Sequence, residues 1–244
     1  MVARIFYPQP LSKNSIVILD PAASHHLLSV LRLKEGEPLQ VFNGEGGSFS
    51  ARLDGRRKKL AVIQIHEFDP SETESPLSIH LGQVISRAER MDFTIQKSVE
   101  LGVNEITPLI SERCGVRLKE QRLENRLEHW SKIAISASEQ SGRCRVPKIN
   151  KVVDFTAFLE QSIEIGFICD PMAKYVLPET TQPMQRLTLI IGPEGGFSEQ
   201  EINHAKKTGV QPLWLGPRIL RTETAAIAAM TLLQRQWGDL AVDF

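Results

Sequence analysis

The stretch "LIIGPEGGFSEQEI", residues 189–202, decides the fold of the larger part of this chain. Its aliphatic residues predict a buried strand, which ends at the glycine-rich turn Gly192–Gly196. A helix is expected to begin directly after this turn, because Ser198 and Glu201 have the spacing of a capping box. The free amides of that helix would point back at the turn, and turns of this kind often hold nucleotides.

A second turn of the same kind lies closer to the C-terminus. The segment "LGPRILRTETA", residues 215–225, follows a strand candidate at 211–216 and leads into an apolar helix candidate at 224–237. Loops that leave the carboxyl ends of parallel strands share one edge of a sheet, and ligands bind in the crevice there. The sequence therefore predicts that residues 192–196 and 216–222 meet across one pocket.

The remainder of the chain after residue 77 supports this sheet. Strand candidates alternate with helix candidates, which favours an α/β fold with a mostly parallel sheet covered on both faces. In the helix candidate 87–101, Met91, Ile95 and Val99 form one apolar stripe, which is expected to face the core. The strand candidates are 77–85, 104–110, 163–170, 186–192 and 211–216, and a second long helix is expected at 121–139.

Residues 1–70 show a different, β-rich pattern. Short apolar runs are separated by "NGEGG" (43–47) and "DGRRKK" (54–59), both typical of hairpin turns. One helix is expected after Asp20, which has the chemistry of an N-cap and is followed by proline. These signals predict a small β-barrel at 1–70, a polar linker at 71–77 and a second domain at 78–244.

The composition is that of a soluble globular protein. The 244 residues are 41% hydrophobic, and 29 basic side chains balance 29 acidic ones. No apolar run is long enough to span a membrane and no signal-peptide pattern is present, so we expect a cytoplasmic protein. Three widely spaced cysteines and six histidines without ligand spacing argue against a metal site or a disulfide framework.

The charge is unevenly distributed despite this balance. Residues 111–151 contain ten basic and five acidic side chains. Such a segment can form a nucleic-acid footprint, and a solvated helix face is the equally acceptable alternative.

The turn at 192–196 lacks the features of the common nucleotide loops. It has neither the lysine of a Walker loop nor the G-x-G-x-x-G spacing of a dinucleotide fold. Glu194 would repel a pyrophosphate, whereas Gly195 and Gly196 allow a ligand to approach the backbone. A neutral or cationic adenosyl ligand such as S-adenosylmethionine fits these features better than ATP or NAD. A purely structural turn that caps the helix is the alternative.

Together, the two turns resemble those of the SPOUT class of RNA methyltransferases. More narrowly, the chain is similar to the 16S ribosomal RNA uridine N3-methyltransferases, the RsmE family, from near Arg4 to the C-terminus. The agreement extends to "LGQVISRAERMDFTIQKSVELGVNEITPL" (81–109), "SERCGV" (111–116) and "EQSGRCRVP" (139–147).

The resemblance implies a PUA-like barrel that binds RNA, followed by a SPOUT methyltransferase domain. That domain would contain a five- or six-stranded parallel sheet and a trefoil knot. The cofactor would be S-adenosylmethionine, held largely by backbone groups. The protein would act as a homodimer with the terminal helix near the interface, but a helix buried within one chain would explain its apolar sequence equally well.

The implied reaction is methyl transfer to N3 of a uridine in 16S rRNA, uridine 1498 by family analogy, during maturation of the small ribosomal subunit. The N3 proton must be removed, or the anion stabilised. The predicted catalytic residues are Arg221 and Glu223. Arg221 could stabilise the anion or pair with Glu194, Glu223 could accept the proton or cap the last helix, and Thr222 has the chemistry of an N-cap.

Two sets of binding residues follow from the resemblance and from the charge pattern. The cofactor set is Gly192, Pro193, Glu194, Gly195, Gly196, Leu215, Gly216, Ile219, Leu220 and Arg221. The RNA set is Arg56, Arg57, Lys58, Lys59, Arg113, Arg117, Arg143 and Arg145, and the alternative for residues 56–59 is a hairpin charged only for solubility.

Two other functions stay open from the sequence. One is methylation of another RNA position or of a ribose 2′-hydroxyl. The segment "RTETA" (221–225) argues for a base as acceptor, because related ribose methyltransferases carry an asparagine-rich pattern there. The other is an RNA-binding protein without catalysis, which would have no need of the intact glycine-rich turn.

Overall fold

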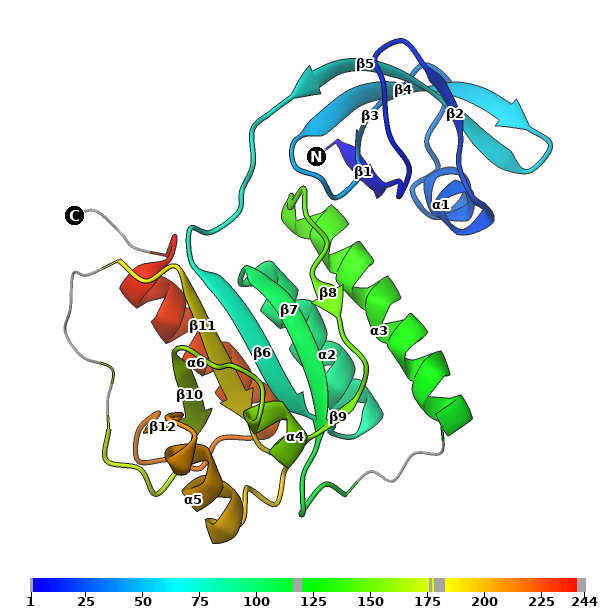
Figure 1. The fold of residues 1–244 in the computed structure, drawn as a ribbon. Coiled ribbons are helices and arrows are strands. Elements are labelled where there is room, and N and C mark those ends of the chain that lie inside the picture. Colours follow the sequence, from blue (N-terminus) through cyan, green and yellow to red (C-terminus); the bar gives the residue numbers. More distant parts are fainter. Residues whose placement is uncertain (1, 116–119, 176, 178–182, 241–244) are drawn as a thin grey trace. The chain divides into compact units, whose positions relative to one another are not determined.

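The computed structural model describes residues 2–115, 120–175, 177 and 183–240, and the chain divides into two compact units (Figure 1). The first unit contains Met1–Glu74 together with Ser138–Val146, and the second contains Ser75–Ala137 and Pro147–Phe244. The segment 138–146 therefore belongs to the first unit, although it follows the expected linker by more than sixty residues. The division at 71–77 remains a prediction.

The first unit is built on a mixed sheet, which has five strands within the described residues. The strand order is β1-β3-β4-β5-β2, with β1 parallel to β3 and the other pairs antiparallel. Side chains from all five strands, among them Ile5, Val17 and Ile63, form its apolar core. The strands are β1 (Ala3–Phe6), β2 (Ile16–Ile18), β3 (Pro38–Phe42), β4 (Ser48–Arg57) and β5 (Leu60–Asp69).

The predicted helix and hairpins of this unit are present. Helix α1 (Pro21–His25) begins after Asp20, whose carboxylate accepts hydrogen bonds from the amides of Ala22 and Ala23 at 2.8 and 3.0 Å. A single π-helical segment, η1 (His26–Val30), continues it. The second hairpin turn is shorter than expected, because β4 extends through Arg57 and Lys58 takes the left-handed conformation at φ 59°.

The second unit contains the predicted parallel sheet. Its seven described strands follow the order β12-β10-β11-β6-β7-β8, with β9 also paired to β7, and every pair is parallel. The strands are β6 (Ser78–Val84), β7 (Val103–Ile110), β8 (Lys148–Ile149), β9 (Val153–Asp154), β10 (Gly166–Cys169), β11 (Arg186–Ile191) and β12 (Gln211–Leu213).

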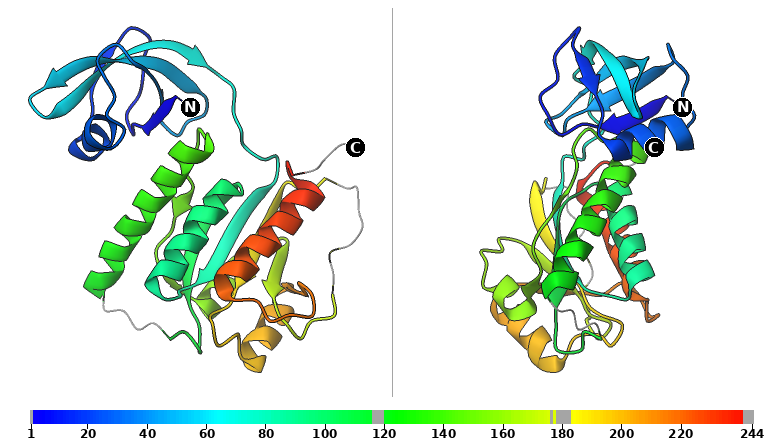
Figure 2. Two further views of the ribbon diagram at one scale, coloured as in Figure 1. Left: turned by 180° about the vertical axis from the view of Figure 1, so that it is seen from behind. Right: turned by 90° about the vertical axis from the view of Figure 1, so that its right-hand side faces the viewer.

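Helices cover both faces of this sheet. Helices α2 (Ala88–Glu100) and α6 (Thr222–Trp237) pack against each other on one face, and α4 (Phe155–Leu159) and α5 (Glu199–Lys207) lie on the other (Figure 2). The predicted stripe Met91, Ile95 and Val99 is fully buried. The long helix α3 (Glu120–Ser141) matches the expected 121–139, and its Trp130 and Ala134 are buried.

Three elements were not predicted, and the expected strand number was too low. Strands β8 and β9 have two residues each and α4 has five, so none is long enough to leave a periodic pattern in the sequence. With the two short strands β8 and β9, the described sheet has seven strands, where five or six were expected. Among the described residues, no helix is both long enough and apolar enough to cross a membrane.

Candidate functional site

The two predicted turns line one cavity of about 280 Å³ at the carboxyl ends of β10, β11 and β12. Because these strands are parallel, the loops that follow them lie at the same edge of the sheet. From the predicted cofactor set, the lining contains Gly192, Pro193, Glu194, Gly195, Gly196, Leu215, Gly216, Ile219 and Leu220. Arg221, the remaining member, is exposed and is not part of the lining.

Two glycines leave backbone surface of this cavity open to a ligand. Gly196 has φ 67° and Gly216 has φ 111°, a region that favours glycine. A Cβ atom built on either residue would meet no other atom within 4 Å. The space beside these two backbone segments is therefore free for a bound molecule, and a side chain would occupy it.

Buried hydrogen bonds connect the two turns. The hydroxyl of Thr222 donates to the carbonyl oxygen of Gly192 at 2.7 Å and accepts from Nε2 of Gln83 at 3.0 Å. Gln83 also donates to the carbonyl oxygen of Val84 at 2.9 Å. The sequence suggested Thr222 as the N-cap of α6, and the structure shows that this is wrong. Arg221 has that position, without a capping side chain, and the threonine hydroxyl instead joins α6 to the glycine-rich turn.

The predicted capping box of α5 is present. The Glu201 amide donates to the Ser198 hydroxyl at 3.2 Å, and the Ser198 amide donates to the Glu201 carboxylate at 2.8 Å. The second oxygen of Glu201 accepts from the amide of Glu112, which follows β7, at 2.8 Å. These bonds fix the start of α5 and so the end of the turn that lines the cavity.

An arginine that the sequence did not single out neutralises Glu194. Nη1 of Arg90, in the first turn of α2, lies 3.1 Å from Oε1 of Glu194, and its Nε lies 3.9 Å from Oε1 of Glu223. The suggested pairing of Arg221 with Glu194 is therefore wrong. The argument that Glu194 would repel a pyrophosphate is weakened as well, because a guanidinium offsets its charge.

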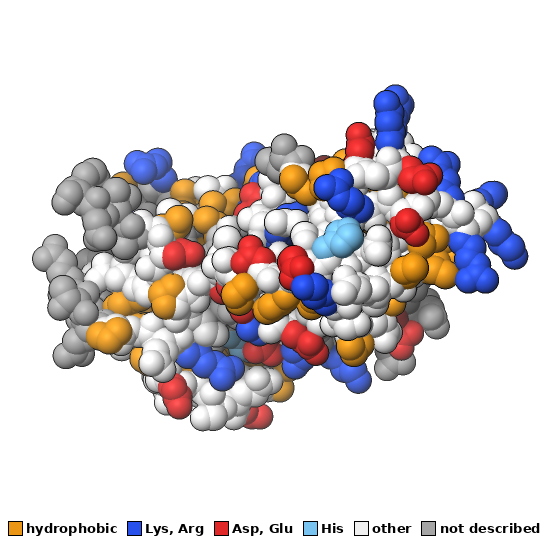
Figure 3. All heavy atoms as spheres, turned by 90° about the horizontal axis from the view of Figure 1, so that it is seen from above, with side chains coloured by type: hydrophobic (Ala, Val, Ile, Leu, Met, Phe, Trp, Pro, Cys, Tyr) orange, Lys and Arg blue, Asp and Glu red, His pale blue; other side chains and the backbone are white. Residues whose placement is uncertain are grey.

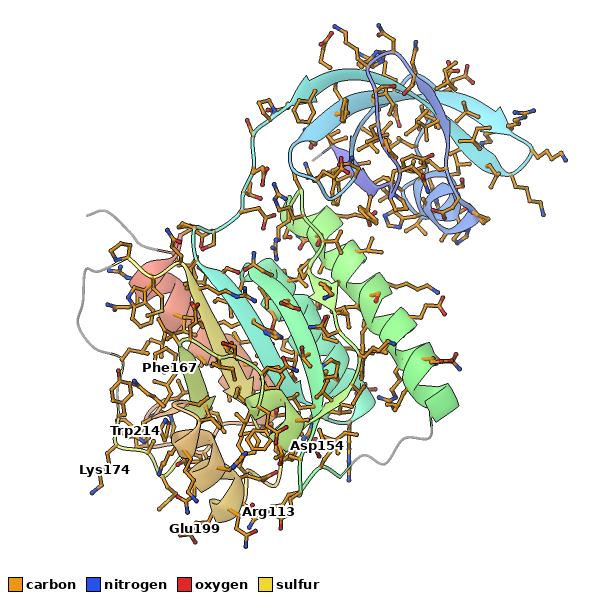
Figure 4. The ribbon with its side chains drawn as sticks, in the orientation of Figure 1. Arg113, Asp154, Phe167, Lys174, Glu199 and Trp214 are labelled. Carbon is orange, nitrogen blue, oxygen red and sulfur yellow. The ribbon has the colours of Figure 1, made fainter. Side chains whose placement is uncertain are left out.

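Residues from neighbouring loops complete the cavity lining. Arg113, predicted to bind RNA, donates from Nη1 to the carbonyl oxygens of Gly195 and Phe197 at 3.4 Å each. Figure 4 shows it at the edge of the sheet to which β6, β7 and β11 point. Asp170 and Met172 follow β10, and a search for polar residues at strand ends would have found Asp170.

Cys169 also lines the cavity but is a poor nucleophile. Burial, together with the negative charge of Asp170, raises the pKa of its thiol to about 12. The thiol is therefore protonated at neutral pH, and the reactive form of a cysteine is the thiolate. The cavity offers backbone groups and charged side chains for binding, and the raised pKa of Cys169 argues against a thiolate nucleophile there.

The remaining predicted RNA-binding residues fall into two places. Four of them, Arg56, Arg57, Lys58 and Lys59, are exposed where β4 meets β5, and basic side chains gather over this hairpin (Figure 3). Arg143 and Arg145 lie in the segment 138–146 of the same unit. Arg117 lies outside the described residues.

Arg143 and Arg145 are both held in ion pairs. Arg143 is 3% exposed, and its guanidinium donates twice to the carboxylate of Glu74, at 2.6 Å from Nη2 and 3.1 Å from Nε. Arg145 is half exposed and donates to Glu72 at 3.0 Å from both Nε and Nη2. The guanidinium of Arg145 is still accessible from the solvent, whereas that of Arg143 is buried in its ion pair with Glu74.

Comparisons with known proteins agree with this architecture. The RNA methyltransferase domain family matches residues 73–234, and the RNA methyltransferase PUA domain family matches residues 19–65. A curated relative from Buchnera aphidicola of the pea aphid, named ribosomal RNA small subunit methyltransferase E, is 40% identical over 240 residues. The alignment covers 98% of this chain and 95% of the relative.

Solved structures agree over the whole chain. A methyltransferase from Legionella pneumophila, solved with its cofactor S-adenosylmethionine, is 40% identical and superposes with a TM-score of 0.95 over 98% of this chain and 100% of its own. A ribosomal RNA small subunit methyltransferase E from Neisseria gonorrhoeae, bound to S-adenosylmethionine, is 40% identical with a TM-score of 0.92 over 99% and 100%. The match of the RNA methyltransferase domain to well over half of the chain, together with relatives 40% identical over nearly its full length, shows that this protein belongs to the RNA methyltransferase family named ribosomal RNA small subunit methyltransferase E.

Proposed function

We propose that this protein transfers the methyl group of S-adenosylmethionine to N3 of a uridine in 16S rRNA, uridine 1498 by the family's assignment. The observation that carries this proposal is the cavity formed by the two glycine-bearing turns in a member of this family. The cavity lining includes every residue that the resemblance assigned to the cofactor except Arg221.

The cavity has the properties that S-adenosylmethionine requires. Gly196 and Gly216 leave room for an adenosyl group against the backbone. Asp170, which lines the cavity, can receive a cationic group of the cofactor. When bound, the cofactor supplies a methyl group activated by its sulfonium, which N3 takes while the sulfonium becomes a neutral thioether.

Glu223 and Arg221 are the proposed catalytic residues. Glu223 lies in the first turn of α6, and its Oε2 is buried without a hydrogen-bond partner among the described residues. Glu223 would accept the N3 proton through its other oxygen, because a fully buried oxygen is out of reach of a substrate base. Arg221 is exposed at the start of the same helix and would stabilise the negative charge on the uracil oxygens. The base must be unpaired or flipped out, since N3 lies on its Watson–Crick edge.

For the RNA, we propose that residues 1–70, together with the segment 138–146 of the same unit, form a binding domain, and that the rest of 78–244 forms the catalytic domain. The hairpin residues Arg56, Arg57, Lys58 and Lys59 would contact phosphates, supported by their exposure and common sign. Arg145 can add a further contact, and Arg113 would bind RNA near the cofactor. Arg117, which lies outside the described residues, stays a proposed RNA-binding residue. Arg143 contributes less, because Glu74 already binds its guanidinium.

Three further properties are proposed from the resemblance. The protein would work as a homodimer in the cytoplasm, and the segment that ends in α6 would form a trefoil knot. The exposed side chains of Phe93 on α2 and Leu232 on α6 support a second copy on this face, because they lie on adjacent helices. Light scattering of the purified protein should give about twice the chain mass of 27.4 kDa, and a monomer would refute the dimer.

The reaction is tested by incubating the protein with S-adenosylmethionine and small ribosomal subunits from a strain that lacks this modification. Nuclease digestion and mass spectrometry should then detect 3-methyluridine at a single position. A methyl group on a ribose or on another base would establish the alternative methyltransferase. RNA affinity without any cofactor binding in calorimetry would establish the non-catalytic alternative.

A further inference from the structure

We propose that Arg90 is a positioning residue that holds the cofactor turn and the proton-accepting carboxylate in one arrangement. It does so through Glu194 on the turn and Glu223 on α6. This inference rests on the proposed function, because it gives Arg90 a task in the same methyl transfer. Arg90 itself need not touch either substrate.

The geometry places one guanidinium between two carboxylates from different elements. Oε1 of Glu194 lies 3.1 Å from Nη1, and Oε1 of Glu223 lies 3.9 Å from Nε. The Glu223 side chain is 14% exposed and that of Arg90 is 35% exposed, so the second contact is partly shielded from solvent. The planar fork of arginine can engage two acceptors at fixed angles, which the single ammonium of lysine cannot do.

The two oxygens of Glu223 are in different conditions. Oε1 faces Arg90, whereas Oε2 is buried and has no hydrogen-bond partner among the described residues. A buried acceptor without a donor is costly in a folded protein, and such groups are concentrated at functional sites. Oε2 has almost no accessible surface, so Oε1, which Arg90 orients, is the oxygen that can receive the proton when the N3–H bond breaks.

The position of Arg90 on α2 is not explained by helix stability. It lies in the first turn, where the helix dipole disfavours a positive charge. Its backbone is held there, since its amide donates to the carbonyl oxygen of Arg87 at 2.9 Å and its carbonyl oxygen accepts from the Thr94 hydroxyl at 2.8 Å. The helix thus presents the guanidinium from a fixed point to the two carboxylates.

Two double-mutant cycles test this role. The variants are Arg90→Met, Glu194→Gln, Glu223→Gln and the two doubles that combine Arg90→Met with each glutamine. The affinity for S-adenosylmethionine is measured by calorimetry, and the rate of 3-methyluridine formation is measured with saturating cofactor and subunits. Lys97→Met serves as the control, because it removes an ion pair with Glu100 from the same helix.

We expect Arg90→Met to weaken cofactor binding about tenfold and to slow methylation about 100-fold, within the range of general acid–base groups. In the Glu194→Gln background, Arg90→Met should weaken cofactor binding by no more than about threefold. In the Glu223→Gln background, Arg90→Met should slow methylation by no more than about threefold. Arg90→Lys should recover part of the rate. The proposal would be overturned if Arg90→Met caused the same losses of affinity and rate in the wild-type, Glu194→Gln and Glu223→Gln backgrounds. It would also be overturned if Arg90→Met changed affinity and rate no more than Lys97→Met does.

Further measurements distinguish the loss of the positioning role from misfolding of a variant and from failure of the proposed function. Thermal unfolding shows whether Arg90→Met and Arg90→Lys are folded, and the lysine variant tests the positioning role if methionine is not tolerated. A wild-type protein that binds cofactor but methylates no RNA refutes the proposed function alone. The calorimetric cycle with Glu194→Gln then still decides whether Arg90 holds the cofactor turn.

Discussion

Replacing Thr222 by valine should destabilise the catalytic unit and loosen its cofactor turn. Valine has nearly the same shape as threonine but lacks the hydroxyl that donates to Gly192 and accepts from Gln83. Thr222 and Gln83 are 4% and 0% exposed, so water has little access to the Gln83 amide, whereas Gly192 is half-buried at the cavity. Each buried polar group left alone costs about 1–3 kcal/mol. Because Gln83 keeps its bond to Val84, we expect a total loss of about 2–3 kcal/mol.

This loss can be measured in two ways. Urea unfolding should show the decrease in the free energy of unfolding, and the thermal midpoint should fall by roughly 4–12 °C for a chain of this size. Calorimetry should show about tenfold weaker binding of S-adenosylmethionine, equivalent to about 1.4 kcal/mol, because Gly192 begins the turn that lines the cavity. Thr222→Ser is the matched control, since it keeps the hydroxyl and loses only a methyl group.

The reasoning would be refuted if valine and serine at position 222 gave the same stability and the same cofactor affinity. That result would mean that shape alone holds the two turns together. A valine variant with normal affinity but reduced stability would show that the turn keeps its form without the hydrogen bond to Gly192.

Three other predictions concern charge. Arg143→Met should lower the free energy of unfolding in urea by about 3–5 kcal/mol, because it leaves Glu74 buried without its partner. Arg145→Met removes a half-exposed pair and should lower it by under about 1 kcal/mol. Equal losses in the two variants would contradict the argument from burial. Changing Arg56, Arg57, Lys58 and Lys59 to alanine should weaken RNA binding as measured by filter binding. The slope of the logarithm of affinity against the logarithm of salt concentration should flatten by about 0.7–0.9 for each phosphate that is no longer bound. An unchanged slope would show that this hairpin is not part of the RNA-binding surface. Burial holds the pKa of His80 below its ordinary value, against the opposing charge of Glu105 and with help from Arg186 and Lys148. The unfolded chain therefore takes up a proton first as the pH falls below about 6.5, and stability present above that pH should be lost as the pH falls through the folded pKa of His80. The effect should be smaller in a His80→Gln variant, and an identical pH profile would exclude His80 as its source.

The sequence could predict those parts of the site that depend on local chemistry. The capping box at Ser198 and Glu201 involves residues three positions apart, and the turn at 192–196 needs only its glycines and the alternation of strands and helices. The partner of Glu194 could not be predicted in this way, because Arg90 is 104 positions away. The same limit explains the error at Thr222, whose side chain has the chemistry of an N-cap but donates to a carbonyl 30 residues earlier.

The first unit is discontinuous in sequence, which has a consequence for its synthesis and for its use in isolation. Glu139 accepts the amide of Phe6 at 2.9 Å, and Arg143 holds Glu74. A fragment cut after residue 74 would expose this amide and leave that carboxylate alone. During translation, the Phe6 amide and the Glu74 carboxylate likewise stay without these partners until residues 138–146 emerge from the ribosome. A shortened gene for the RNA-binding part should therefore carry the later segment, grafted on through a designed loop.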